Sequence, residues 1–537
     1  MTTLVQGTTT DDTLTRDALT VLQPGFDGID APPDWVLRRI GEGLAAVALF
    51  GRNIASAEQV TALTSRLRAE NPDILVAIDE EGGDVTRLEV RTGSSFPGNL
   101  ALGAVDDTAL TREVAYALGG RLAACGVDFN WAPSADVNSD PDNPVIGVRS
   151  FGADPALVAR HTVAYVEGMQ AAGVATCTKH FPGHGDTNVD SHHAMPRIDA
   201  DLATLRSREL TPFKAAIAAG SKAVMSAHIV LPALDPERPA TLSPRILTGL
   251  LREELGYDGL IVTDGMDMQA ISAVYGIERG AVLALAAGAD ALCVGGGPSD
   301  EGTVLRLRDA LVAAVRAGEL PEKRLADAAA RVRALASWTR SHRATGGAST
   351  ESGAASVPGT APARTAGGVA PGSTTTPGIG TPETGTPGTG TPEIGLVAAR
   401  RALAVTGTAP APTGPVHVAA FTPEANIAVG DETPWGLGPE LARLVPGTST
   451  APYGPDTAAG QVLADAGERR IVAVVRDAHR HRWMTTALDT LLAARPDTVV
   501  VEMGLNQAPP RGALHIATYG AARVCGLAAA EVVARGV

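Results

Sequence analysis

The chain has 537 residues, which is too long for one ordinary hydrophobic core and suggests two or three domains. Hydrophobic residues make up 45% and charged residues 19%, a composition typical of globular proteins. The net charge of −15 argues against nucleic acid or an anionic membrane as a partner, because clustered Lys and Arg bind such surfaces.

The four cysteines are scattered without a Cys-x-x-Cys pair, which favours buried apolar roles over a disulfide framework or a zinc ribbon. The amino-terminal residues show no basic segment followed by an apolar one, and no window of about 18 apolar residues occurs. We therefore expect a soluble, cytoplasmic protein.

Residues 12–340 alternate short apolar, β-branched runs with amphipathic helical patterns, which indicates βαβ units and a parallel sheet. Eight strands in roughly 330 residues favour a (β/α)8 TIM-type barrel over a doubly wound open sheet, although both place ligands at the carboxyl ends of strands. The expected strands are residues 18–22, 44–49, 74–78, 127–132, 174–178, 223–227, 260–263 and 289–294.

Chemically capable side chains follow five of these strands. They are Asp79-Glu80-Glu81 after the third, Asp136 after the fourth, Lys179-His180 after the fifth, His228 after the sixth and Asp264 after the seventh. In a barrel these positions share one face, so we expect the active site there.

A helix expected at residues 321–338 ends the barrel pattern. Residues 341–394 consist almost entirely of Gly, Pro, Thr, Ser and Ala, which predicts a disordered linker, because such a segment buries too little apolar surface to fold.

Residues 395–537 return to a globular composition and predict a smaller C-terminal α/β domain with a parallel sheet. Its expected elements are a helix at 397–403 and strands at 416–421, 471–475 and 499–503; a basic stretch at 476–483 is interpreted as a solvated loop.

The segment from Lys179 to His193 holds four histidines, a lysine and two acids among small residues. A metal site is one interpretation, although the spacing matches no motif such as His-Glu-x-x-His, and histidines that merely pair with the loop's own acids are another. We favour proton transfer by His192 with Asp190, because a carboxylate two residues away can orient an imidazole whose pKa is about 6.5. Asp264 is placed to attack an electrophilic carbon from the opposite side.

Four motifs occur in order along the barrel. The segment from Lys179 to Thr187, Lys-His-Phe-Pro-Gly-His-Gly-Asp-Thr, is followed by Asp190-Ser191-His192. The other three are Asp79-x-Glu81-Gly82-Gly83-x-Val85-x-Arg87, Arg149-Ser150-Phe151-Gly152 and Thr263-Asp264-Gly265-Met266. Together they resemble the motifs of bacterial β-N-acetylglucosaminidases in glycoside hydrolase family 3.

The resemblance implies a retaining exo-glycosidase that hydrolyses terminal non-reducing β-N-acetylglucosaminides from muropeptide or chitin-derived fragments. It implies a covalent glycosyl-Asp264 intermediate and a His192/Asp190 acid/base dyad. By the same resemblance, five residues hold the terminal N-acetylglucosamine: Asp79, Arg87, Arg149, Lys179 and His180. No cofactor or metal is expected, and the partner is a small oligosaccharide or muropeptide rather than nucleic acid or a membrane.

Other interpretations stay open. A phosphorylase would use the same site with phosphate in place of water, and a non-catalytic sugar-binding protein would need neither Asp264 nor His192. Asp84 stands where the family commonly has Arg, and we expect it to add negative charge near the sugar pocket. Because Gly183 and Gly185 give the histidine loop freedom, we also expect its distal part to move on sugar binding.

Overall fold

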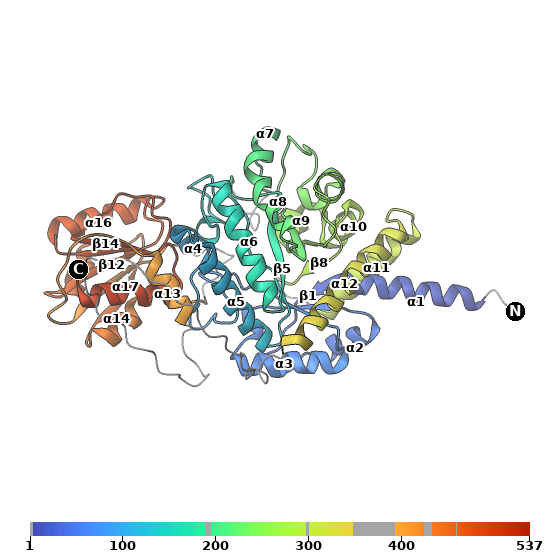
Figure 1. Cartoon of the computed structure of the whole chain (residues 1–537), viewed down its shortest axis with the longest axis horizontal. Coiled ribbons are helices and arrows are strands. Elements are labelled where there is room, and N and C mark those ends of the chain that lie inside the picture. The colour runs from blue at the N-terminus through green and yellow to red at the C-terminus, as the bar shows by residue number, and fades with distance from the viewer. Residues whose placement is uncertain (1–3, 188–194, 297–299, 347–392, 424–431, 458) are drawn as a thin grey trace, which may run out of the picture.

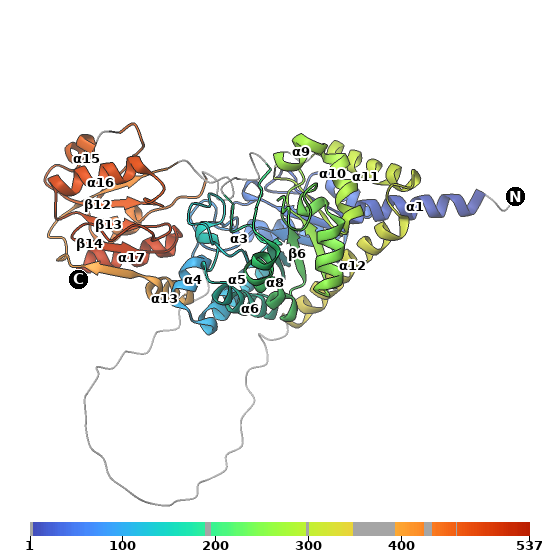
Figure 2. The same ribbon diagram turned by 90° about the horizontal axis from the view of Figure 1, so that it is seen from above.

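A computed structural model of the chain describes residues 4–187, 195–296, 300–346, 393–423, 432–457 and 459–537. A large α/β barrel comes first, and a smaller α/β domain packs beside it, at the far end from the N-terminus (Figures 1 and 2). Most of the predicted linker lies outside the described residues. The helix before it continues past the expected end at residue 338 and reaches Gly346.

Eight parallel strands form the barrel. β2 to β7 form one sheet in chain order, β8 pairs with β1, and a bridge between Val262 and Ala291 joins β7 to β8. β1 packs against β2, so the strands follow one another around a closed barrel and confirm the predicted fold. The strands are β1 (Leu22–Pro24), β2 (Ala46–Leu49), β3 (Leu75–Ile78), β4 (Phe129–Asn130), β5 (Ala175–Phe181), β6 (Ala223–Ser226), β7 (Leu260–Thr263) and β8 (Leu292–Val294).

Seven strands lie where the sequence predicts them, and the first does not. Residues 18–20 belong to helix α1 (Leu4–Thr20), and β1 begins only at Leu22. Leu14 and Ala18, four residues apart, are both buried, so the apolar run continues the buried face of the helix. A short apolar run of this kind fits a buried helix end as well as a strand.

Helices cover the outside of the barrel (Figure 1). Asp107 and Asp154 cap the amino ends of α5 and α6 by accepting hydrogen bonds from two backbone N–H groups each. After α1, the barrel helices are α2 (Asp34–Glu42), α3 (Ala57–Glu70), α4 (Asn99–Val105), α5 (Thr108–Ala124), α6 (Pro155–Ala171), α7 (Leu202–Thr204), α8 (Leu210–Ala218), α9 (Gln269–Tyr275), α10 (Ile277–Ala287), α11 (Glu301–Arg316) and α12 (Glu322–Gly346). Short 3-10 helices lie at Gly51–Asn53, Gly147–Arg149 and Ala240–Leu242, and π-helical segments at Leu205–Glu209 and Arg245–Glu254.

Alternation along the strands divides the barrel's apolar residues into two layers. In β2, Val47 and Leu49 belong to the core shared with the helices, whereas Ala46 and Ala48 belong to the core inside the barrel. All four cysteines are free and buried, as their spacing predicts.

The second domain is built on a six-stranded sheet with strand order β11-β10-β12-β13-β14-β9. The predicted parallel sheet is confirmed, and β10, β12 and β13 lie where the sequence predicts strands. The sequence did not predict the parallel strands β11 and β14 or the antiparallel edge strand β9. Its elements are β9 (Ala404–Gly407), β10 (Val416–Phe421), β11 (Ser449–Tyr453), β12 (Arg470–Val475), β13 (Val499–Glu502) and β14 (Leu514–Ala517), with α13 (Glu393–Ala402), α14 (Gly438–Leu444), α15 (Ala459–Ala466), α16 (Arg482–Ala494) and α17 (Arg523–Arg535).

Helix α13 belongs to both parts of the molecule. It packs against α17 of its own domain and against α4 and α5 of the barrel (Figures 1 and 2). Ala398, on its buried side, is part of the barrel's hydrophobic core. The two domains therefore share an apolar contact.

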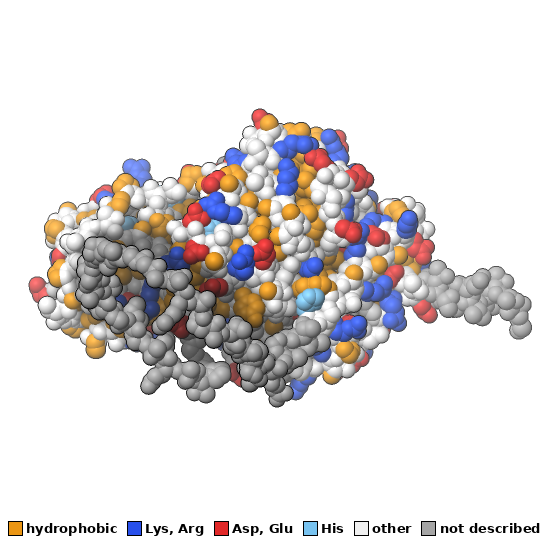
Figure 3. All heavy atoms as spheres, in the orientation of Figure 1, with side chains coloured by type: hydrophobic (Ala, Val, Ile, Leu, Met, Phe, Trp, Pro, Cys, Tyr) orange, Lys and Arg blue, Asp and Glu red, His pale blue; other side chains and the backbone are white. Residues whose placement is uncertain are grey.

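Acidic and basic side chains are interspersed over the barrel on the face shown in Figure 3. Among the described helices, none is by itself both long and apolar enough to cross a bilayer. Helices α9 and α10 meet that criterion only when taken together, and they are bent by 107° relative to each other.

Candidate active site

A cavity of about 610 Å³ opens at the carboxyl ends of the barrel strands. Six of the eight predicted site residues line it: Asp79, Arg87, Arg149, Lys179, His180 and Asp264. They come from the ends of β3, β5 and β7 and from the loop after β4, which is the face where a barrel places its active site.

A buried lysine lies between two carboxylates in this cavity. The Lys179 ammonium is 2.5 Å from Oδ1 of Asp79 and 2.6 Å from Oε1 of Glu81, and its side chain is 3% exposed. Burial alone would lower the pKa of Lys179, but these two carboxylates outweigh it and raise the pKa. Lys179 therefore stays charged, and its two ion pairs hold its ammonium group in place at the cavity.

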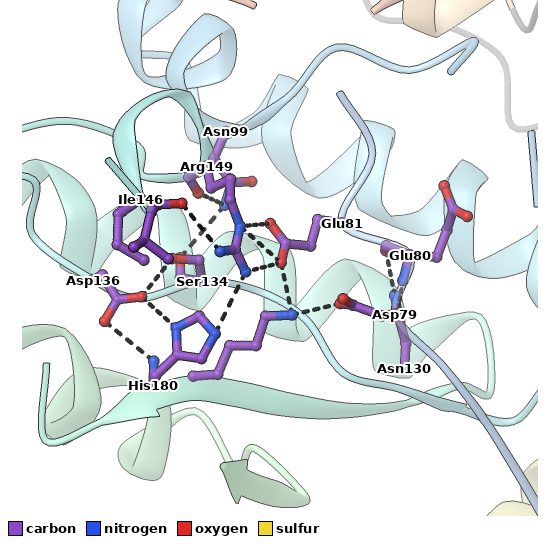
Figure 4. A network of polar contacts seen from close by, with 12 residues as sticks. Asp79, Glu80, Glu81, Asn99, Asn130, Ser134, Asp136, Ile146, Arg149 and His180 are labelled. Atoms are coloured by element: carbon purple, nitrogen blue, oxygen red, sulfur yellow. Dashed lines mark hydrogen bonds and ion pairs between the residues drawn. The ribbon is translucent and has the colours of Figure 1, made fainter. Parts of the chain in front are cut away.

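Arg149 makes a bidentate ion pair with the same Glu81. Its Nη2 and Nε lie 2.7 and 3.1 Å from the two carboxylate oxygens, and Nη1 donates to the carbonyl of Val145. Burial would raise the pKa of Glu81, but the charges of Arg149 and Lys179 outweigh it and hold the pKa well below its usual range. Glu81 stays ionised and joins the two cations into one network (Figure 4).

His180 is oriented by Asp136, which lies in the loop after β4. The His180 ring contacts Asp136 through Nδ1 at 2.7 Å, and Nε2 lies 3.4 Å from the Arg149 guanidinium. Although burial alone would raise it, the pKa of Asp136 falls to about 2 because of its contacts with His180. Asp136 also accepts hydrogen bonds from the backbone N–H groups of His180 and His184, so it fixes this stretch of chain.

Arg87 also lines the cavity. Its Nη2 lies 3.5 Å from Oδ2 of Asp79, and its backbone N–H donates to the buried carboxyl of Glu80. The same carboxyl oxygen accepts from the N–H of Leu88, so Glu80 shapes the turn that brings Arg87 to the cavity.

Asp264 follows β7 and is half-buried at the cavity wall. Its Oδ1 accepts a hydrogen bond from the N–H of Gly265, and the carbonyl of Gly265 is contacted by the buried ring of His228. Thr241 contacts the other nitrogen of that ring, so the chain next to Asp264 is anchored to the loop after β6.

The other two predicted site residues, Asp190 and His192, lie outside the described residues. The alternative metal site also included His180, His184 and Asp186, which are described. His180 contacts Asp136 and Asp186 pairs with Arg208, and the described residues contain no group of three or more His, Cys, Asp or Glu arranged to hold a metal ion.

The glycines of the histidine loop serve close packing. A Cβ on Gly183 would lie 2.6 Å from a carboxylate oxygen of Glu209, and one on Gly185 would lie 1.7 Å from the carbonyl oxygen of Val137. The expectation that these two glycines give the loop freedom is therefore wrong for this part of it. The predicted movement concerns the distal part, which is outside the described residues.

Asp84 does not contribute charge to the cavity, contrary to the expectation from its position. It is buried at the contact between the domains, where it pairs with Arg476 and accepts a hydrogen bond from the N–H of Ala521.

The basic stretch 476–483 is not only a solvated loop, because two of its side chains contact the barrel. Arg480 donates to the carbonyl of Asn143 and His479 lies 3.2 Å from the carbonyl of Pro141, both in the barrel.

Four further residues belong to this cavity or its support, although the sequence assigned none of them a sugar-binding or catalytic role. Glu81 and Asp136 stood in a motif and at a strand end, which is a usable signal. His184 is buried, lines the cavity and has two ring nitrogens without a hydrogen-bond partner among the described residues; burial lowers its pKa to about 4, so the ring is neutral near pH 7. Glu432 reaches the cavity from the second domain, and no local pattern marks it.

Known proteins match the barrel domain in sequence. Residues 39–335 match the Glycosyl hydrolase family 3 N terminal domain. Beta-hexosaminidase A of Pseudoalteromonas piscicida is 39% identical over 278 residues, which span 48% of this chain and 45% of that protein. Beta-hexosaminidase of Stenotrophomonas maltophilia (strain R551-3) is 40% identical over 269 residues, which span 49% of this chain and 78% of that protein.

A solved structure matches both domains. The glycoside hydrolase family 3 β-N-acetylglucosaminidase from Paenibacillus sp. str. FPU-7 is similar over 98% of each chain, with 32% identity and a TM-score of 0.79. The β-N-acetylhexosaminidase from Beutenbergia cavernae DSM 12333 covers 60% of this chain and 98% of its own, with 31% identity and a TM-score of 0.54. The family match spans more than half of the chain, including the four motifs, and the chain belongs to glycosyl hydrolase family 3.

Proposed function

We propose that the protein is a retaining exo-glycosidase that hydrolyses terminal, non-reducing β-N-acetylglucosaminides. The observation that carries the proposal is one cavity lined both by the half-buried carboxylate of Asp264 and by a charge-paired cluster suited to sugar hydroxyls. The name of the Paenibacillus protein, similar over 98% of both chains, supports this activity, as do the names of the curated β-hexosaminidases.

In this proposal Asp79, Arg87, Arg149, Lys179 and His180 hold the terminal sugar. The cations donate to hydroxyl oxygens and Asp79 accepts from hydroxyl groups. Ion pairs fix these side chains before the sugar arrives, so little binding energy is lost in ordering them.

The reaction proceeds in two displacements. The Asp264 carboxylate bonds to the anomeric carbon as the glycosidic bond breaks, and His192 gives its proton to the leaving oxygen. His192 then takes a proton from the water that attacks the same carbon, and Asp264 leaves as a carboxylate, so the configuration is retained. Asp190 orients His192; the roles of this dyad rest on the sequence motif.

We extend the proposal to muropeptide or chitin-derived fragments as substrates, to a cytoplasmic location, and to catalysis without a cofactor. The proposed domains are the catalytic barrel at 12–340, a linker at 341–394 and a C-terminal domain at 395–537. None of these extensions alters the test of the activity itself.

Substitution Asp264→Ala tests the central assignment. Without the nucleophile no glycosyl-enzyme can form, so we expect release of nitrophenol from a nitrophenyl β-N-acetylglucosaminide to fall to the background rate. Asp258→Asn, an exposed carboxylate that precedes the same strand, is the matched control and should keep wild-type turnover. Substantial turnover by the Asp264→Ala protein would overturn the assignment.

Two additional measurements test the acid role of His192 and distinguish a hydrolase from a phosphorylase. Because a good leaving group needs less protonation, His192→Ala should lose more activity on alkyl than on dinitrophenyl glycosides; equal losses would remove His192 from the acid role. Products formed in phosphate buffer should be free N-acetylglucosamine, released first as the β-anomer. A sugar 1-phosphate in its place would establish the phosphorylase.

A further inference from the structure

The loop between β3 and α4, residues 79–98, is held from outside by the second domain. Asp84, in the middle of its first turn, is 6% exposed and pairs with Arg476, which directly follows β12. Its other oxygen accepts a hydrogen bond of 2.7 Å from the N–H of Ala521. Farther along, the carbonyl of Ser94 accepts from the N–H of Val524 at 3.2 Å.

Only two residues separate Asp84 from Glu81 on one side and from Arg87 on the other. The turn between them is closed by a backbone hydrogen bond from Glu81 to the carbonyl of Val85 and packed against the chain at Gly98. Glu81 carries the ion pairs of Lys179 and Arg149, and Arg87 lines the cavity. A displacement of Asp84 would therefore move the turn that carries Glu81 and Arg87.

The same short segment of the second domain, residues 476–480, also contacts the loop after β4. Arg480 donates to the carbonyl of Asn143, whose side-chain amide donates to the carbonyl of His184. The Asn143 side-chain oxygen accepts from the N–H of Val145, and the Val145 carbonyl accepts from Arg149. One segment of the second domain therefore contacts both the loop after β3, which carries Glu81 and Arg87, and the loop after β4, which carries Arg149.

We propose that residues 476–480 of the second domain position the sugar-binding side chains, chiefly through the Arg476–Asp84 ion pair. The proposal rests on the proposed function. Arg476 and Asp84 are positioning residues, since neither lines the cavity. The charge of Asp84 thus links the second domain to the sugar-binding loop and does not act on the cavity directly.

Steady-state kinetics of Arg476→Gln, Asp84→Asn and the double variant test the proposal. Asp84→Asn keeps an oxygen for the N–H of Ala521, so it removes mainly the ion pair. We expect each single change to raise KM for the chromogenic substrate roughly tenfold, with a smaller change in kcat, because Asp264 is held elsewhere. The double variant should be less impaired than the product of the two single effects, since the pair acts as a unit.

The matched control is Arg401→Gln, which removes an exposed ion pair between the same two domains, with Asp107. It should leave KM within about twofold of wild type. Arg476→Lys keeps the charge and should recover part of the loss. Equal KM values for Arg476→Gln and Arg401→Gln would overturn the proposal.

Hydrogen–deuterium exchange supplies a readout that does not depend on turnover. The N–H groups of Arg87 and Leu88, which donate to Glu80, should exchange faster in Arg476→Gln than in Arg401→Gln. Unchanged exchange would also overturn the proposal. A wild-type protein without hydrolase activity would refute the proposed function instead, while this exchange comparison would still decide whether the brace exists.

Discussion

The charges of the cavity are tolerated in a buried place because they occur in pairs. Glu81 has two cationic partners and Asp136 has His180, so each carboxylate stays ionised although burial opposes it. Removing one partner would leave a buried charge unpaired, which costs more than the pair contributes. The charged side chains of the site therefore stabilise one another, and a single substitution among them disturbs more than one side chain.

Glu80, the residue before Glu81, has no such cation among the described residues, and this makes a pH-dependent prediction. Burial raises its pKa to about 7, from an ordinary value of 4.5. Between these pH values the folded chain keeps a proton that the unfolded chain has lost, so Glu80 lowers the free energy of unfolding as pH rises, by roughly 3 kcal/mol in total. The Glu80→Gln protein, which keeps an oxygen for the N–H groups of Arg87 and Leu88, should lack this loss.

Urea unfolding of both proteins at pH 5 and pH 8 measures the difference. Glu80→Gln should gain stability relative to wild type as pH rises, whereas Glu113→Gln, at an exposed position of α5, should follow wild type. Parallel curves for wild type and Glu80→Gln would mean that Glu80 is ionised throughout.

At the scale of elements, the sequence predicts what depends on local pattern. Strands β2 to β8 are apolar runs bounded by turns, and α5 and α6 carry regular apolar stripes with Asp caps, so both could be located. The end of α1 could not, because residues 18–22 suit either a helix or a strand. Edge strand β9 also escaped notice, since most of its side chains are exposed and its pairing with β14 is distant in the chain.

The contact between α5 and α6 depends on glycines that no local pattern marks as essential. A Cβ on Gly168 would lie 2.2 Å from the carbonyl oxygen of Arg112, so Gly168→Ala should push the helices apart and lower stability by roughly 1–3 kcal/mol. Gly120→Ala, at an open position of α5, should instead raise it by up to about 1 kcal/mol. Thermal unfolding of the two variants checks the contrast, and a stabilised Gly168→Ala protein would contradict it.

At the scale of the molecule, the sequence separates the two domains but does not show that they meet. The strand-end rule locates Asp79, Lys179 and Asp264 because a barrel gathers strand ends on one face. Glu432 and the partners of Asp84 come from another domain, and their approach is decided by surfaces whose complementarity no periodicity reveals. The functional assignment of Asp84 failed for this reason.

The apolar contact between the domains can be tested at Gly395 in α13. A Cβ there would lie 2.2 Å from the carbonyl oxygen of Ser95, so Gly395→Ala should force α13 away from the barrel and lower stability by roughly 1–3 kcal/mol. Gly414→Ala, in a loop of the same domain with open space around it, should change stability little. Calorimetric melting of both variants distinguishes them; equal melting temperatures would show that the contact yields without cost.

The buried cysteines allow the predicted movement of the histidine loop to be tested by spectroscopy. Burial raises the pKa of all four thiols, so few of them are thiolates at neutral pH, and a thiolate is the form that reacts with a maleimide dye. The native four would then compete little for the dye with a cysteine introduced in place of Val189. Fluorescence of that label with and without N-acetylglucosamine would report directly whether the segment carrying Asp190 and His192 changes position.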